Sequence, residues 1–292
     1  CDYLLARGDE VVAIDDLTTG SADNLRHQAT NPAFELVVAD VSAELPVQGR
    51  FDAVLNLASP ASPPAYLARP LETLAVGSEG TRRLLELAHR DGARFLMAST
   101  SEVYGDPTVH PQVESYRGNV DPVGPRGVYD EAKRFSEALT MAYKTKLDAN
   151  VSIVRIFNTY GPRLAPGDGR VVSNFIVQAL RGEPLTVYGD GSQTRSLCYV
   201  ADEVRGLVAL LDSSLTGPVN IGNPDERTVL DLAERVIAMT GSSSTIEFHP
   251  LPTDDPTRRC PDITVAKREL GWEPEIAFEE GIRRTVEHFA AL

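Results

Sequence analysis

The sequence has few cysteines, an excess of acidic over basic residues and no long apolar run. Its three cysteines are Cys1, Cys198 and Cys260, and an odd number at these spacings does not form a disulfide framework. Free thiols of this kind predict a reducing compartment, the cytoplasm. A formal net charge of −14 argues against nucleic acids and anionic membrane surfaces as partners. No apolar run reaches about 18 residues, so we expect no membrane-spanning helix.

Histidine is also sparse, and its distribution predicts no metal site. The five histidines do not show the short spacings of metal ligands: His27, His89, His110, His249 and His288. The chain has 292 residues and 42% hydrophobic content, which suffices for one or two domains with a substantial core.

Strand and helix patterns alternate in the first half of the chain. Apolar strands are predicted at 11–14, 34–40, 53–58, 94–98 and 151–156, with helices at 2–8, 71–89 and 127–146. This alternation predicts an α/β fold, a Rossmann-type doubly wound parallel sheet with helices on both faces. The pattern loosens after residue 160, with helices near 171–181, 201–213, 228–240, 262–270 and 279–290. We therefore expect a sheet domain at 1–160 and a smaller mixed α/β lobe at 161–292, with some exchange of elements between them.

A glycine-rich turn between a first strand and a first helix is absent. Asp15 has the position of the acidic residue that follows such a turn at the end of the next strand. The sequence opens inside the helix that would connect the glycine-rich turn to the strand ending in Asp15. The first strand of a doubly wound sheet is central, and its loss would leave neighbouring strands unpaired. We therefore expect that the numbering omits an N-terminal strand and its glycine loop.

The most informative motif is Tyr129-x-x-x-Lys133, which follows a Ser/Thr-rich run at 99–105. Residues four apart share a helix face, so the ammonium group lies one turn from the phenol. A phenol with a pKa near 10 is a poor base, and a nearby cation is expected to favour the phenolate. With the Thr100 hydroxyl, such a pair can take a proton from a sugar alcohol. A solvated helix face can carry the same spacing by chance.

The resemblance to a known family rests on longer segments. They are LASPASPP (57–64), ASTSEVYGDP (98–107), RIFNTYGPR (155–163), DGRVVSNF (168–175), GEPLTVYG (182–189) and GWEP (271–274). With them the chain resembles the extended short-chain dehydrogenase/reductase family of nucleotide-sugar enzymes over essentially its whole length. Within this family it is most similar to the UDP-glucuronic acid decarboxylase branch, for which the first two segments are fairly specific.

The resemblance implies NAD as the cofactor and assigns roles to individual residues. The cofactor-binding residues would be Asp15, Asp16, Thr18, Thr19, Gly20, Asp40, Val41, Leu57, Ala58 and Ser59, together with Thr100, Tyr129 and Lys133. The catalytic residues would be Thr100, Glu102, Tyr129 and Lys133. The nucleotide-sugar substrate would contact Glu102, Asn158, Val172, Tyr188, Arg195 and Arg259. For Arg259 the diphosphate, the uronate carboxylate and a plain surface ion pair remain alternatives.

The resemblance also implies a reaction and an assembly. UDP-glucuronate would lose carbon dioxide through a 4-keto intermediate to give UDP-xylose, with no net oxidant consumed. A homodimer would form through helices near 71–89 and 128–145. Sugar 4,6-dehydratases carry an aspartic acid where this chain has Ser101, a much poorer proton donor, so dehydration is disfavoured. A 4-epimerase and a catalytically silent NAD-binding sensor remain alternatives.

One segment departs from the decarboxylase pattern. That branch commonly has lysine and asparagine where this chain has Ala75 and Gly77. The loss of a cation near the sugar leaves the identity of the sugar open. Glycine also weakens a helix by roughly 1 kcal/mol relative to alanine, so Gly77 requires a reason such as close packing.

Overall fold

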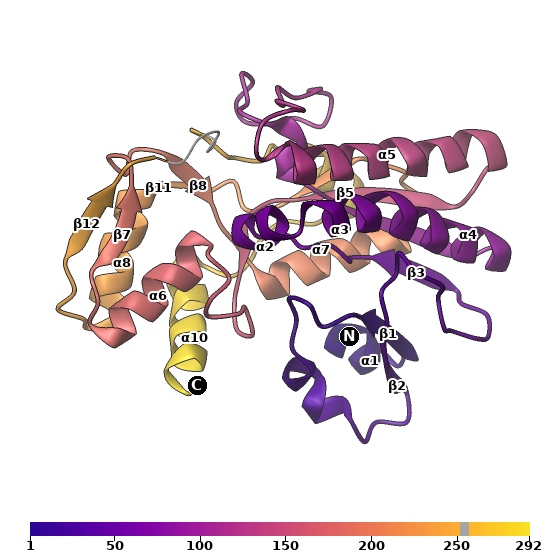
Figure 1. Ribbon diagram of the computed structural model, residues 1–292, viewed down its shortest axis with the longest axis horizontal. Helices are drawn as coiled ribbons and strands as arrows, with labels where there is room; N and C mark the ends of the chain where they lie inside the picture. Colours follow the sequence, from indigo (N-terminus) through magenta and orange to yellow (C-terminus); the bar gives the residue numbers. More distant parts are fainter. Residues whose placement is uncertain (252–256) are drawn as a thin grey trace.

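The computed structural model describes residues 1–251 and 257–292, and its main layer is a four-stranded parallel sheet in the order β10-β5-β4-β3 (Figure 1). The strands are β1 (Val11–Asp15), β2 (Phe34–Val38), β3 (Ala53–Asn56), β4 (Arg94–Thr100), β5 (Val151–Ile156), β6 (Thr159–Tyr160), β7 (Leu185–Tyr188), β8 (Thr194–Ser196), β9 (Cys198–Tyr199), β10 (Val219–Ile221), β11 (Glu226–Thr228) and β12 (Ile246–His249). The strands predicted from the first half of the sequence are confirmed.

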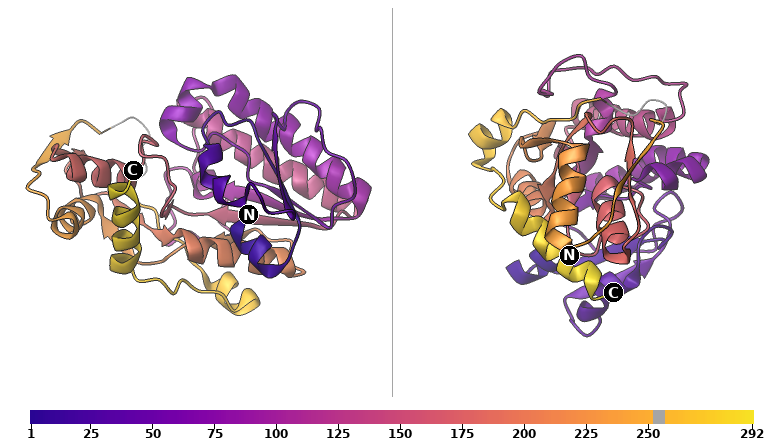
Figure 2. Two further views of the ribbon diagram at one scale, coloured as in Figure 1. Left: turned by 90° about the horizontal axis from the view of Figure 1, so that it is seen from below. Right: turned by 90° about the vertical axis from the view of Figure 1, so that its left-hand side faces the viewer.

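Helices cover both faces of this sheet (Figures 1 and 2). The helical elements are α1 (Asp2–Arg7), η1 (Ala22–Gln28), α2 (Pro63–Ala68), α3 (Pro70–Ala75), η2 (Val76–Gly80), α4 (Thr81–Asp91), η3 (Ser101–Tyr104), α5 (Gly127–Leu147), α6 (Val171–Arg181), α7 (Val200–Asp212), α8 (Val229–Thr240), α9 (Thr264–Leu270) and α10 (Phe278–Ala290). Among the described residues, no helix combines the length and the apolar character needed to cross a membrane.

Strand β4 shows how the sequence builds the two cores. Its side chains alternate between faces: Phe95 and Met97 pack in the core under α4 and α5, whereas Leu96 and Ala98 pack in the core with α7 and α9. All of these side chains are buried. The unbroken apolar run from Phe95 to Ala98 is therefore what a sheet covered on both faces requires, and the predicted α/β architecture is confirmed.

Strands β1 and β2 form a separate parallel pair, with Val11 opposite Phe34. Figure 1 shows this pair beside β3, at the end of the sheet that carries the N-terminus. Among the described residues, β1 and β3 each have one edge without a strand partner. The preceding strand and glycine loop stay a prediction.

The second half of the chain contributes to both layers. Helices α6, α8 and α10 share a core of their own with β7 and β9, seen as the smaller lobe in Figures 1 and 2. Strand β10 instead pairs with β5, and α7 and α9 pack on the main sheet. Exchange of elements thus occurs across the proposed boundary near residue 160. The division into 1–160 and 161–292 itself stays a prediction.

The helix predicted at 71–89 is interrupted in the structure. It consists of α3, the π-helical turn η2 and α4, and Gly77 lies in η2. A Cβ atom at Gly77 would lie 2.7 Å from the Cβ of Ala132 on α5 and 3.1 Å from the Ala132 carbonyl oxygen. Close packing against α5 is therefore the physical reason for a glycine at this position.

Replacing Gly77 with alanine is expected to lower the free energy of unfolding by about 1–2 kcal/mol. Alanine gains roughly 1 kcal/mol of helix propensity, but overpacking against backbone typically costs 1–3 kcal/mol and should win. Urea denaturation of Gly77→Ala measures the effect. In an Ala132→Gly background the same substitution should cost less, and an equal loss in both backgrounds would exclude the Ala132 contact as its cause.

Candidate functional site

The carboxyl ends of β3, β4 and β5 surround a cavity of about 210 Å³. Its wall includes the four residues that the sequence motifs single out as catalytic, Thr100, Glu102, Tyr129 and Lys133. Thr100 ends β4, Glu102 lies in the 3-10 turn η3 that follows, and the other two belong to the first turns of α5. Side chains at the carboxyl ends of parallel strands converge at one edge of a sheet, which is where open α/β sheets bind ligands.

Lys133 is buried against the end of β4. Its Nζ donates a hydrogen bond of 3.0 Å to the Ala98 carbonyl and lies 5.9 Å from the centre of the Tyr129 ring. Burial lowers the pKa of the Lys133 ammonium to about 8, because a low-dielectric interior disfavours the charged form. The ammonium is therefore mostly protonated at neutral pH, and the carbonyl fixes its position on the helix face that carries Tyr129.

The prediction that the pKa of the Tyr129 phenol is lowered in favour of the phenolate is wrong for this structure. Burial raises the pKa of the Tyr129 phenol to about 12, a hydrogen bond with Thr100 opposes this, and the charge of Glu102 adds to it. The phenol is only 5% exposed. Desolvation thus outweighs the nearby donors, and the Tyr-x-x-x-Lys spacing does not set the pKa on its own.

Tyr66 on α2 is a neighbour of Tyr129 that no sequence pattern singled out. Its ring stacks on Tyr129 with centroids 5.0 Å apart and planes inclined by 6°. Tyr66 is 1% exposed, and within the described parts of the chain nothing pairs with its buried hydroxyl. The segment before it, Ser-Pro-Ala-Ser-Pro-Pro, signals a turn into a helix but says nothing of a ring beside Tyr129.

Two arginines hold the Glu102 carboxylate. Arg126 lies 2.7 Å and Arg259 3.1 Å from the same carboxylate oxygen, and Arg259 also donates to the Ser101 carbonyl. Burial raises the pKa of Glu102, but the charges of Arg259 and Arg126 more than offset this and lower it to about 2. Glu102 is therefore ionised at neutral pH and is not a solvated surface carboxylate. Sequence reasoning missed Arg126, which lies in the loop before α5.

The residues proposed for the cofactor follow successive strands. Asp15 ends β1, where its Oδ1 accepts the Leu17 N–H at 2.7 Å, and a Cβ on Gly20 would lie 3.4 Å from its other oxygen. Asp40 follows β2 and accepts from the Ser42 N–H at 2.8 Å. The remaining residues of this set lie in the exposed loop after β1, in the core beside η2, and in the segment after β3: Asp16, Thr18, Thr19, Val41, Leu57, Ala58 and Ser59.

The residues proposed for the substrate do not all reach the cavity. Asn158 lines it, as does Arg170, which sequence reasoning did not select. Arg195 lies on β8, close enough for its charge to lower the pKa of Glu102. Tyr188 ends β7 and is 43% exposed. Val172 is buried in the core of the smaller lobe, so its side chain is part of the packing there.

Comparison with known proteins identifies the family. Residues 1–222 match the model of the NAD dependent epimerase/dehydratase family. The chain belongs to this family. It is 52% identical over 288 residues to UDP-glucuronic acid decarboxylase 1 of Arabidopsis thaliana, covering 99% of this chain and 66% of that relative, slightly under two thirds of its length.

Solved structures of epimerases share the fold. The UDP-glucose 4-epimerase of Thermotoga maritima, solved with UDP-glucose, superposes with a TM-score of 0.90 at 29% identity, covering 99% of this chain and 93% of that one. A variant UDP-glucuronic acid 4-epimerase of Bacillus cereus, solved with a fluorinated UDP-glucuronic acid and NAD, gives 0.89 at 26% identity with the same coverage.

NAD is the cofactor of this epimerase/dehydratase family, and the residues present fit it. A carboxylate at the end of β1 suits the two hydroxyls of an adenosine ribose and repels a 2′-phosphate, which favours NAD over NADP. At the other end, Thr100, Tyr129 and Lys133 bring two hydroxyls and an ammonium to one cavity wall. Asp15, Asp40 and these three residues would hold the dinucleotide along the carboxyl ends of β1, β2 and β4.

Proposed function

We propose that this protein decarboxylates UDP-glucuronate to UDP-xylose through a 4-keto intermediate, with no net consumption of NAD. The observation that carries the proposal is the pair of arginines, Arg126 and Arg259, fixed on Glu102 at the wall of the cavity that holds Thr100 and Tyr129. Guanidinium groups recognise carboxylates with planar, paired hydrogen bonds, and a uronate brings a carboxylate into this cavity. The identity to a plant UDP-glucuronic acid decarboxylase supports the same reading.

Tyr129 and Thr100 act on the 4-hydroxyl of the sugar. When bound, NAD would supply the hydride acceptor. The hydrogen bond with Thr100 lowers the pKa of the Tyr129 phenol, in the direction opposite to the burial that dominates there. Tyr129 then takes the proton of the 4-hydroxyl, and Thr100 donates a hydrogen bond to the oxygen as it becomes a carbonyl.

Glu102 and its arginines act at the carboxylate end of the sugar. A ketone at C4 is β to the carboxylate. When carbon dioxide leaves, the electron pair of the broken carbon–carbon bond is delocalised into an enolate, which Thr100 and Tyr129 stabilise by hydrogen bonds. Glu102 has a pKa of about 2 and cannot itself supply the proton that C5 then needs. Its role is to orient a water molecule for that protonation and to position the two guanidinium groups.

A 4-epimerase is the second candidate, favoured by the likeness to the two epimerase structures. It would keep the carboxylate and return the hydrogen at C4 to the opposite face of the sugar. A 4,6-dehydratase is disfavoured by Ser101, because a serine hydroxyl is a poor acid for expelling water. A silent NAD-binding sensor is disfavoured because the buried Tyr129 and Lys133 are both kept at the cavity.

Proton NMR of the products separates these candidates. The protein is incubated with UDP-glucuronate and catalytic NAD, and the anomeric and C5 signals are followed. Decarboxylation predicts UDP-xylose, whose C5 carries two protons. A uronate inverted at C4 would establish the epimerase instead. An unchanged substrate would point to another nucleotide sugar, and retained NAD binding without turnover of any nucleotide sugar in a substrate panel would favour the sensor.

We also propose that the protein is a homodimer that associates through α3 and α5. These helices pack beside each other along one side of the molecule (Figure 1) and expose large apolar side chains to solvent. Leu71 is 76%, Leu74 42%, Phe135 50% and Met141 38% exposed. Exposed apolar groups gathered on two adjacent helices are typical of a surface that a partner covers.

Replacing Phe135 with aspartate is expected to convert the dimer to a monomer. A charge at the centre of an apolar interface loses its hydration on association, which should weaken the dimer on the order of a hundredfold. Light scattering coupled to size exclusion measures the mass. Val123→Asp is the matched control, because Val123 is 92% exposed in the loop before α5. A monomeric wild type, or a Phe135→Asp variant that stays dimeric, would contradict the proposal.

The compartment proposed for the protein is the cytoplasm. Cys1 is an exposed free thiol, and Cys198 and Cys260 are buried free thiols. Unpaired cysteines are typical of proteins kept in a reducing environment.

A further inference from the structure

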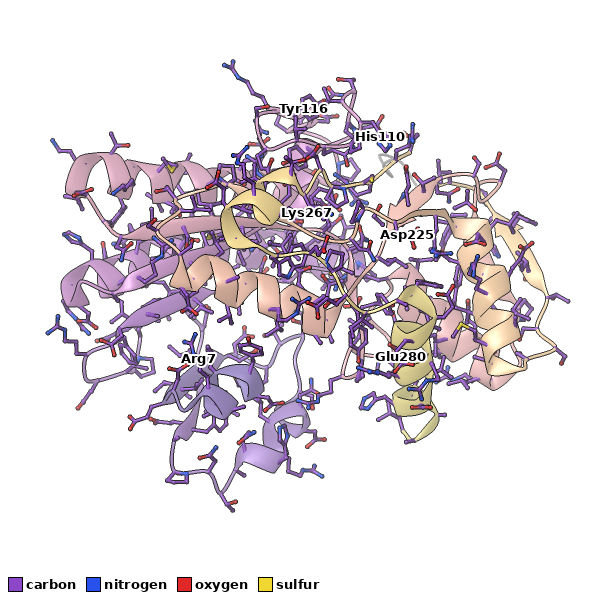
Figure 3. The ribbon with its side chains drawn as sticks, turned by 180° about the vertical axis from the view of Figure 1, so that it is seen from behind. Arg7, His110, Tyr116, Asp225, Lys267 and Glu280 are labelled. Carbon is purple, nitrogen blue, oxygen red and sulfur yellow. The ribbon has the colours of Figure 1, made fainter. Side chains whose placement is uncertain are left out.

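A group of side chains with metal-binding chemistry lies outside the cavity. The ligand atoms of His110, Glu226 and Cys260 all fall within 4.8 Å of one another, and His110 Nε2 is 3.1 Å from a Glu226 carboxylate oxygen. The three residues come from the loop between η3 and α5, from the start of β11 and from the segment before α9. Figure 3 shows His110 and Asp225, the neighbour of Glu226, on the same side of the molecule.

The three donors select one class of ion. An imidazole nitrogen, a thiolate sulfur and a carboxylate oxygen together suit Zn²⁺ and related thiophilic divalent ions, whereas Ca²⁺ and Mg²⁺ prefer oxygen alone. Ligand atoms around a tetrahedral zinc ion lie roughly 3.3–3.8 Å apart, so the group would have to contract by about 1 Å. His110 and Glu226 are partly exposed and form the rim, while Cys260 is buried beneath them.

The backbone around the group is held in place before any ion binds. Gln112 clamps the Cys260 segment through both backbone and side chain. Its N–H donates to the Cys260 carbonyl at 2.8 Å, and its Oε1 accepts the Cys260 N–H at 2.9 Å. Gln112 is two residues from His110, so the clamp holds the two backbone segments side by side and leaves the side chains to close the remaining distance. Pre-organised ligands of this kind reduce the ordering that metal binding requires.

The group already attracts a cation from the chain itself. The Nη2 of Arg258 lies 2.7 Å from His110 Nε2 and 3.1 Å from Glu226 Oε2, so one guanidinium contacts two of the three prospective ligands. The Arg258 side chain is 53% exposed and can turn into solvent. A metal ion and Arg258 would therefore compete for the same position.

We propose that His110, Glu226 and Cys260 form a binding site for a thiophilic divalent cation of the zinc class, which displaces the Arg258 guanidinium and takes water as its remaining ligand. On binding, the Cys260 thiol releases its proton to solvent and its sulfur bonds to the ion, with no change of oxidation state. The ion would join the loop after η3 to the segment that carries Arg259. The proposal does not depend on the reaction assigned to the cavity.

Cobalt(II) titration of the untagged, chelator-treated protein tests the site. A Co²⁺–thiolate bond gives a charge-transfer band in the near ultraviolet that other cobalt sites lack. We expect this band to saturate at one ion per chain, to disappear on addition of Zn²⁺, and to be absent in Cys260→Ser. It should be weakened in Glu226→Gln and unchanged in Cys1→Ser, which removes an exposed thiol. Circular dichroism establishes that each variant is folded.

The Arg258→Gln variant should strengthen cobalt binding, whereas the variants at the ligands weaken it, because the cation that competes with the metal is removed. Its affinity for Co²⁺ should rise on the order of tenfold relative to wild type. Zn²⁺ should raise the Tm of the wild type and of Cys1→Ser but not of Cys260→Ser, since a ligand that binds only the folded state stabilises it. Absence of the band in both the wild type and Arg258→Gln, or its persistence in Cys260→Ser, would overturn the proposal.

Discussion

Replacing Tyr129 with phenylalanine is expected to lower kcat for UDP-glucuronate by about 10³-fold, the usual scale for a lost general base. The change removes a single oxygen and keeps the ring that stacks on Tyr66. UDP affinity should therefore stay close to that of the wild type. Steady-state turnover together with calorimetric titration of UDP measures both quantities.

Tyr143→Phe is the matched control for this experiment. Tyr143 lies on the same helix, α5, where it packs against the core and is not part of the cavity lining. It should keep wild-type turnover and the same pH profile. Residual activity of Tyr129→Phe above about one tenth of the wild type would remove the phenol from the mechanism as its base.

Glu102→Gln should reduce both turnover and stability. The buried guanidinium of Arg259, which is only 1% exposed, and the partly buried guanidinium of Arg126 would lose the carboxylate charge that compensates them. Removing one member of a buried ion pair costs about 3 kcal/mol or more, because the remaining charge is left without a counter-charge. We expect kcat to fall roughly a hundredfold, since the carboxylate no longer orients water at the sugar.

The double variant Glu102→Gln/Arg126→Gln separates the two effects. Removing one guanidinium along with the carboxylate reduces the excess positive charge, so part of the lost stability should return. Turnover should not return, because neither the carboxylate nor the second arginine is present. Chemical denaturation and product assays on the two single variants and the double variant measure this cycle. Recovery of turnover in the double variant would show that Glu102 acts only through stability.

The sequence predicted those features that depend on neighbouring residues. Strand β4 is apolar from Phe95 to Ala98 because both of its faces are covered, and α5 carries Tyr129 and Lys133 one turn apart, so periodicity was sufficient for both. The pKa of Tyr129 was predicted in the wrong direction. Spacing reveals a neighbouring cation but not the burial that outweighs it.

Contacts between distant residues could not be predicted in this way. Glu102 and Arg259 are 157 positions apart, and nothing local marks Arg126 or Tyr66 as their neighbours. The same holds for the proposed cation site, because His110, Glu226 and Cys260 have no metal-ligand spacing along the chain. Only the folded arrangement of three segments brings their ligand atoms together.

The most direct test of the proposed activity uses UDP-glucuronate labelled at its carboxylate. The protein receives this substrate with NAD at a small fraction of its concentration, and the released carbon dioxide is trapped and compared with the UDP-xylose formed. We expect equal amounts of the two, many turnovers per NAD, and no accumulation of NADH. Label that remains in a uronate while the sugar is altered, or product limited to the amount of NAD supplied, would contradict it.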